Sequence, residues 1–204
     1  GDTTNNAWSQ GDGLTFSASG ETDGGLTVSS SYVLDNGALD DYSVSISTDS
    51  MGTVTFHAMD GSSALGAVDD VMPTAYEEPW FGVTSPSKID GTSGANMFQY
   101  TSPSVGGATF TATYNQADST IVESQTSYAI AYSPEMVDGL TVGYAVQDDT
   151  ATGVATSAKD ESTMYAKYTF GSITAGYQVS ESDSATASEN MESTGMAISY
   201  AISD

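Results

Sequence analysis

Apolar and polar residues alternate with a period of two along most of this 204-residue chain. In the last such segment, Met196, Ile198, Tyr200 and Ile202 alternate with small or polar residues. Successive side chains of a β-strand point to opposite faces, so this period predicts strands with one apolar and one polar face. The i, i+3, i+4 spacing of an amphipathic helix is not sustained anywhere. The chain is therefore predicted to be all-β.

The alternation predicts eleven strands, and the connections between them differ in length. The strands are expected at residues 14–22, 25–34, 42–48, 53–59, 96–101, 107–115, 126–133, 139–147, 162–169, 171–180 and 193–202. Short connections rich in Gly, Pro and Asp alternate with longer ones at 35–41, 60–95, 116–125, 148–161 and 181–192. In an antiparallel up-and-down sheet, all short turns then lie at one end and all long loops at the other. That asymmetry is typical of outer-membrane barrels.

A soluble β-sandwich would show the same alternation, with its apolar face turned inward. Two features favour a transmembrane barrel. Several strands reach nine or ten residues, about enough to cross the hydrocarbon layer when tilted. Aromatic residues also gather near strand ends, where interfacial girdles form, at Tyr32, Tyr42, Phe98, Tyr100, Tyr114, Tyr168 and Phe170. Most acids fall outside the predicted strands, which leaves the expected spans nearly free of charge.

The charge balance excludes several functions. There are 27 Asp and Glu residues against three lysines, with no arginine, no cysteine and a net charge of −24. Nucleic-acid binding and docking on anionic lipid through a basic patch both require Lys or Arg, and without cysteine there is no thiol catalysis or disulfide scaffold. A Ser-His-Asp arrangement would have to use His57. The carboxylate pairs Asp148-Asp149 and Glu77-Glu78 are sequence neighbours in predicted loops, so no enzyme is expected.

The insert at residues 60–95 carries the resemblance to a known family. It contains Asp69-Asp70 and the run 73–82 (PTAYEEPWFG), and it is followed by a predicted strand with the sequence Met97-Phe98-Gln99-Tyr100. With the pattern of strand, short turn and long loop, this resembles the general porins of Gram-negative outer membranes, and the alphaproteobacterial, Rhodobacter-like branch looks closest. The resemblance implies one barrel domain over residues 1–204, with the insert folded into the lumen.

Several expectations follow from that resemblance. The chain would lie in the bacterial outer membrane as a homotrimer in contact with lipid and lipopolysaccharide. It would form a water-filled channel for small hydrophilic solutes and ions. The family usually opposes its acidic loop with Arg and Lys on the barrel wall, but the strands predicted between residues 14 and 59 offer only His57 on the polar face. A ring of carboxylates favours cations, so we expect a cation preference. The pore-constricting candidates are Asp60, Asp69, Asp70, Glu77 and Glu78.

Two further interpretations concern metal and chain length. Asp69, Asp70, Glu77 and Glu78 are hard oxygen ligands that could hold Ca²⁺, although they lack EF-hand spacing; no organic cofactor is expected. The alternative function is a secreted or surface β-rich adhesive or structural protein with acidic Ca²⁺-binding loops. The insert follows the fourth predicted strand rather than the fifth, so in a sixteen-stranded barrel one strand would be absent in front and four behind, leaving the porin incomplete at both ends.

Overall fold

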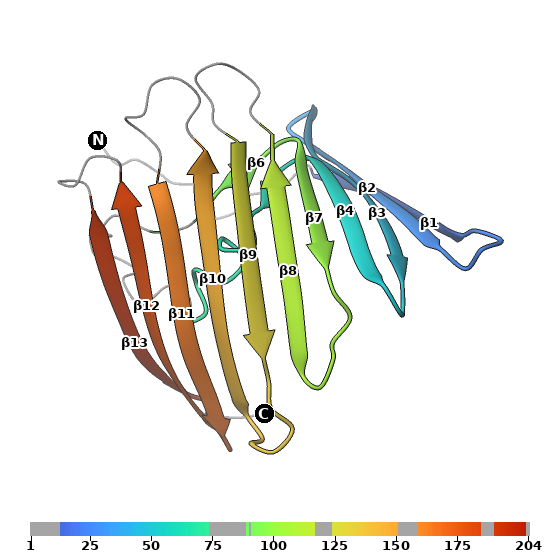
Figure 1. Cartoon of the computed structure of the whole chain (residues 1–204). Coiled ribbons are helices and arrows are strands. Elements are labelled where there is room, and N and C mark those ends of the chain that lie inside the picture. The colour runs from blue at the N-terminus through green and yellow to red at the C-terminus, as the bar shows by residue number, and fades with distance from the viewer. Residues whose placement is uncertain are drawn as a thin grey trace, which may run out of the picture.

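A computed structural model describes residues 13–73, 89, 91–116, 124–150, 159–184 and 190–202. It confirms the all-β antiparallel class. Eleven strands form one curved sheet in which each is hydrogen-bonded to its neighbours along the chain (Figure 1). They are β1 (Leu14–Glu21), β2 (Thr27–Asp35), β3 (Ala38–Thr48), β4 (Gly52–Met59), β7 (Met97–Thr101), β8 (Ala108–Asn115), β9 (Ser124–Tyr132), β10 (Leu140–Thr150), β11 (Lys159–Phe170), β12 (Ile173–Ser184) and β13 (Met191–Tyr200). Two short strands, β5 (Gly61–Ser62) and β6 (Ser93–Gly94), form a ribbon within the insert. None of the described residues forms a helix of the length and hydropathy needed to cross a membrane.

The two faces of the sheet differ in chemistry, as the alternation predicts. On the face that we call outer, large apolar side chains such as Phe16, Ile46, Phe110 and Ile130 are exposed to between 40% and 55%. On the opposite, inner face, Thr, Ser, Gln and Gly predominate, and residues of the insert lie against this face. An apolar surface of this extent marks contact with a membrane or with a partner protein.

The pairing register is staggered across the sheet. One row of Cα partners on the outer face begins at Ala18, near the middle of β1. It passes through Phe56 and Phe98 and ends at Asp183, near the end of β12. A row perpendicular to the strands therefore climbs toward the long-loop end as it crosses the sheet. Such a stagger accompanies tilted strands in a barrel wall.

Aromatic side chains pair across strands on the outer face. Tyr32 packs against Phe16 and Tyr42, with ring centroids 6.5 and 6.0 Å apart. Phe56 and Phe98 lie 4.9 Å apart on β4 and β7. The Tyr32–Tyr42 pair is edge-to-face and the other two are tilted; aromatic pairs in favourable geometry add about 0.5–1.5 kcal/mol each beyond the apolar area that they bury.

The connection expected as a long loop at residues 35–41 is instead a tight hairpin turn. Asn36 and Gly37 have φ angles of 50° and 72°, and β3 begins directly after them at Ala38. Two consecutive residues with positive φ match the type I′ turn, which Asn-Gly favours because its twist fits the flanking strands. The acids Asp40 and Asp41 continue β3 instead of forming a loop, so short and long connections do not alternate strictly.

The strands are also longer at the loop end than expected, and their extensions carry acids. Asp148, Asp160 and Asp183 are adjacent Cα partners on β10, β11 and β12. The prediction of nearly charge-free strands is therefore wrong for these ends. Strands of 11 or 12 residues reach or exceed the roughly 9–11 residues that cross the hydrocarbon layer, so their last residues can continue the ladder in water.

Candidate functional site

The insert leaves the sheet through a narrow neck. Asp60 adopts a positive φ of 53°, and β5 pairs with β6 directly after it. A Cβ atom at Gly61 would lie 2.8 Å from His57 Cβ and 3.1 Å from Met97 Cβ. Only a residue without a side chain fits there, so Gly61 allows the neck to approach β4 and β7 on the inner face.

Backbone N–H groups beyond the neck donate to wall hydroxyls. Ala64 N–H donates to Thr113 Oγ1 at 3.1 Å, and Leu65 N–H donates to Ser127 Oγ at 2.8 Å. Ser127 Oγ in turn donates to the carbonyl oxygen of Val146 at 2.9 Å. Ala64 and Leu65 are fully buried, and buried backbone groups need such partners because an unpaired one costs about 1–3 kcal/mol. The insert is thereby attached to β8 and β9.

The returning limb of the insert is held by Gln147 on β10. Gln147 Nε2 donates to Thr92 Oγ1 at 2.8 Å, and Thr92 N–H donates to Gln147 Oε1 at 3.0 Å. Thr92 N–H also lies 3.1 Å from Ser63 Oγ, which accepts from Gly66 N–H as well. These bonds tie the outgoing and returning limbs to each other and to the wall.

The outgoing limb continues across the inner face to β12 and β13. Gln178 Nε2 donates to the carbonyl oxygens of Val68 at 3.1 Å and Asp69 at 2.7 Å. A Cβ atom at Gly176 would lie 2.5 Å from Pro73 Cδ, and one at Gly195 would lie 3.3 Å from Met72 Cγ. Two glycines therefore leave the space that Met72 and Pro73 occupy.

The anchors Thr113, Ser127 and Gln147 belong to one register row on the inner face, which we call the polar row. Every member of this row is polar. It consists of Ser19, Ser29, Ser45, Thr55, Gln99, Thr113, Ser127, Gln147, Glu161 and Ser182. The part on β8 to β10 binds the insert and is buried there, whereas Ser19 remains exposed and Ser29 half-buried.

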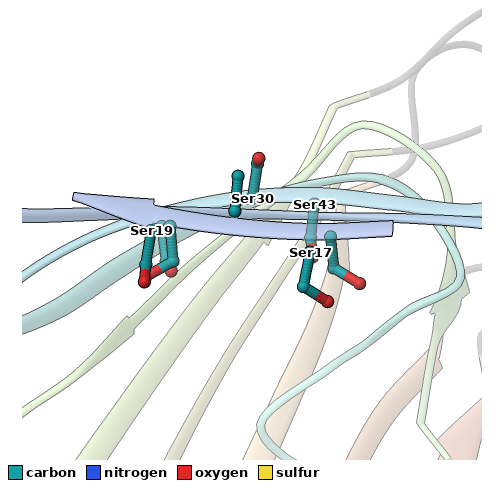
Figure 2. Close-up of a pocket in the computed structure, with 8 residues that line it drawn as sticks. Ser17, Ser19, Ser30 and Ser43 are labelled. Atoms are coloured by element: carbon teal, nitrogen blue, oxygen red, sulfur yellow. The ribbon is translucent and has the colours of Figure 1, made fainter. Parts of the chain in front are cut away.

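The inner face of β1 to β4 carries a dense array of hydroxyls, which we call the hydroxyl wall. It comprises Thr15, Ser17, Ser19, Thr27, Ser29, Ser31, Ser43, Ser45, Ser47, Thr53 and Thr55. A groove of about 300 Å³ lies against its serines. In Figure 2, Ser17 and Ser19 point to one side of the sheet and Ser30 to the other, as the alternation requires.

The predicted site residues are not gathered in one cluster. Asp60 lies at the neck, whereas Asp69 and Asp70 lie in the segment held on β12; Asp70 is exposed and Asp69 half-buried. Glu77 and Glu78 lie outside the described residues. His57 is on the inner face, as predicted, with its Nε2 atom 3.2 Å from Gln99 Oε1. Within the described ranges, no three His, Cys, Asp or Glu residues are arranged to hold a metal ion.

The sequence analysis missed two kinds of inner-face residue. Lys159 and Lys167 are each an even number of residues from Thr163 along β11 and therefore lie on the inner face with it. The alternation could have located Lys167, whereas Lys159 fell in the predicted loop 148–161. The anchors Thr113, Ser127, Gln147 and Gln178 looked like ordinary lumen-lining residues. Their common role depends on the strand register, which the alternation does not determine.

Comparison with known proteins identifies the family. A family model described as "Gram-negative porin" matches residues 1–204, so the chain belongs to the Gram-negative porin family. Among solved structures, a loop L8 deletion mutant of OmpT, an outer membrane protein of Vibrio cholerae, matches with a TM-score of 0.69 at 12% identity, over 95% of this chain and 70% of that one. The anion-selective porin from Comamonas acidovorans matches with a TM-score of 0.62 at 16% identity, over 91% of this chain and 62% of that one. A triple mutant of Rhodopseudomonas blastica porin is 22% identical over 94% of this chain and 80% of its own, with a TM-score of 0.49. A search of curated proteins found no match.

Family and fold together make this chain an outer-membrane porin. Its outer apolar face is the surface that meets lipid, and its inner polar face lines the lumen. The prediction of a porin is confirmed, while the alphaproteobacterial branch stays a prediction. The alternative of a secreted or surface adhesive protein is not supported. The chain spans 70% of the length of the Vibrio cholerae structure and 62% of the length of the Comamonas porin.

Proposed function

We propose that this porin forms a water-filled, weakly cation-preferring channel for passive diffusion of small hydrophilic solutes and ions, and that the insert narrows the channel. The observation that carries the proposal is the attachment of the insert to the inner face from β8 to β12. An insert attached in this way occupies space that would otherwise be open lumen. Asp70 of the insert is exposed.

The distribution of charge supports the cation preference. The sequence contains no Lys or Arg before Lys88, so the hydroxyl wall presents neutral groups to the lumen. Lys159 and Lys167 lie on β11, the neighbour of the strand that holds Asp69, and reduce the negative potential there without cancelling it over the whole channel. A lumen with excess carboxylates raises the local concentration of cations. The anion selectivity of the Comamonas porin is not carried over to this chain, because a likeness at 16% identity shows the fold alone.

The partners and the absence of catalysis belong to the same proposal. The exposed apolar outer face suits lipid, lipopolysaccharide and two further copies of the chain in a homotrimer. His57 contacts an amide oxygen, which suits a lumen-lining residue better than a catalytic base. Family membership points to a channel, and we propose that the chain has no enzymatic activity. Calcium binding by Asp69, Asp70, Glu77 and Glu78 stays a prediction from the sequence.

Reversal potentials test the function directly. The protein is refolded in detergent, inserted into planar bilayers and measured across a KCl gradient. We expect stable open channels whose reversal potential has the sign of a K⁺ preference. Channels that prefer Cl⁻ would refute the cation preference, and bilayers that stay closed despite folded protein would refute the pore itself.

A further inference from the structure

The side-chain amide of Gln178 is buried beneath the insert and is held in a fixed orientation. Gln178 is 5% exposed. Its Nε2 atom also lies 3.0 Å from Thr163 Oγ1, which is 2.7 Å from Ser180 Oγ. Thr163 and Ser180 are themselves buried. A donor oriented by neighbours of this kind keeps its direction even when the chain that it binds moves.

The segment that Gln178 contacts is fixed on both sides of the acidic pair. Before Asp70, the carbonyl oxygens of Val68 and Asp69 accept from Gln178. After it, Met72 and Pro73 fill the space above Gly176. The Cα partner of Gln178 on β13 is Gly195, which Met72 also approaches. Gln178 is thus a long donor next to Gly176 and Gly195, a combination that lets the insert lie close to the wall and be held there.

We propose that Gln178 is a positioning residue for ion permeation: by holding the carbonyls of Val68 and Asp69, it sets where the carboxylates of Asp69 and Asp70 stand in the channel. This inference rests on the proposed cation-preferring pore. Gln178 itself carries no charge, so its effect on selectivity is exerted through the position of the acids. Without its two hydrogen bonds, the segment 66–73 remains tethered at Ala64 and Leu65 and keeps only the packing of Met72 and Pro73 against β12.

Two readouts test the proposal on the full chain. The sequence lacks cysteine, so Ala67→Cys at an exposed position accepts a single nitroxide label whose mobility reports on the segment. The variants are Gln178→Leu, which removes both donors at similar volume, and Gln125→Leu as the matched control. Gln125 is half-buried on the same face and has Asn115 and Asp149 as Cα partners. Gln178→Met, which is also neutral and lacks the amide donors, serves if Gln178→Leu fails to fold.

We expect the Gln178 variants, but not Gln125→Leu, to raise label mobility and to lower the K⁺/Cl⁻ permeability ratio by up to about four-fold, since one unit charge about 10 Å from an ion in water changes the local cation and anion concentrations about two-fold each, in opposite directions. Unchanged mobility would overturn the proposal, and so would raised mobility with an unchanged ratio in a cation-preferring channel. A wild-type channel without cation preference would refute the proposed function instead, and label mobility would then decide alone whether Gln178 positions the segment.

Discussion

The ring of Tyr165 lies across the backbone of Gly143 on the inner face. The two residues are Cα partners on β11 and β10, and a Cβ atom at Gly143 would stand 2.6 Å from Tyr165 Cζ. Tyr165 is 8% exposed. The glycine therefore provides the space into which the ring packs, and the ring covers backbone that a glycine leaves bare.

Gly143→Ala should destabilise the protein because the added methyl group pushes the Tyr165 ring off its neighbour. Overpacking of this kind costs about 1–3 kcal/mol. The free energy of unfolding in urea, followed in lipid vesicles by the gel mobility of unheated samples, measures the effect. Gly20→Ala is the matched control, since no atom lies within 4 Å of its Cβ position. Equal stability of the two variants would contradict this packing.

Ser127→Ala should loosen the attachment of the insert. The substitution leaves the buried N–H of Leu65 without its acceptor, at a cost of about 1–3 kcal/mol. We expect lower stability and larger current fluctuations in single-channel records. Ser29→Ala, in the same polar row but away from the insert, should change neither. Similar records from both variants would mean that the hydroxyl of Ser127 does not hold the insert.

Substitution by lysine should have different effects at two adjacent serines of β2, because their side chains lie on opposite faces of the sheet. Ser29→Lys places a charge on the hydroxyl wall, in water, and should lower the K⁺/Cl⁻ permeability ratio while the protein still folds. Ser30→Lys places the same charge on the lipid-facing side, where it costs about 2–4 kcal/mol near the bilayer midplane. Refolding yields into vesicles and reversal potentials distinguish the two. If Ser30→Lys folds as well as Ser29→Lys, the assignment of the faces is wrong.

Neutralising Asp70 should weaken the cation preference. Asp70→Asn removes one exposed carboxylate from the insert, and we expect the K⁺/Cl⁻ ratio to fall by up to about four-fold, by the same Coulomb argument. Asp23→Asn, in the turn between β1 and β2 at the other end of the strands, is the control and should leave the ratio near the wild-type value. A larger effect at Asp23 than at Asp70 would place the selectivity determinant away from the insert.

The sequence predicted the class of fold well because the alternation of residues reports directly on the two faces of a strand. It predicted strand ends less well, since acids were read as loop residues. At Asp40 and Asp148 the ladder continues, because a strand can carry charge once it leaves the hydrocarbon. The turn Asn36-Gly37 was recognisable from its residue pair, but the acids after it suggested a longer connection.

The site was less predictable than the fold. That residues 60–95 form a special segment follows from their length alone. Its attachment does not, because Thr113, Ser127 and Gln147 become neighbours only through pairing across β8, β9 and β10. A shift of one residue in register would have turned the same side chains toward lipid.

The bonds from Thr113, Ser127, Gln147 and Gln178 to the insert join neutral groups: backbone N–H and C=O, hydroxyls and amides. Dissolved salt screens interactions between charges, with a Debye length of about 10 Å at 0.1 M and about 3 Å at 1 M, but has little effect on hydrogen bonds of this kind. Ionic strength thus separates the two properties of the channel. In concentrated electrolyte the discrimination between cation and anion should fade, while the width of the passage, set by neutral contacts, stays the same.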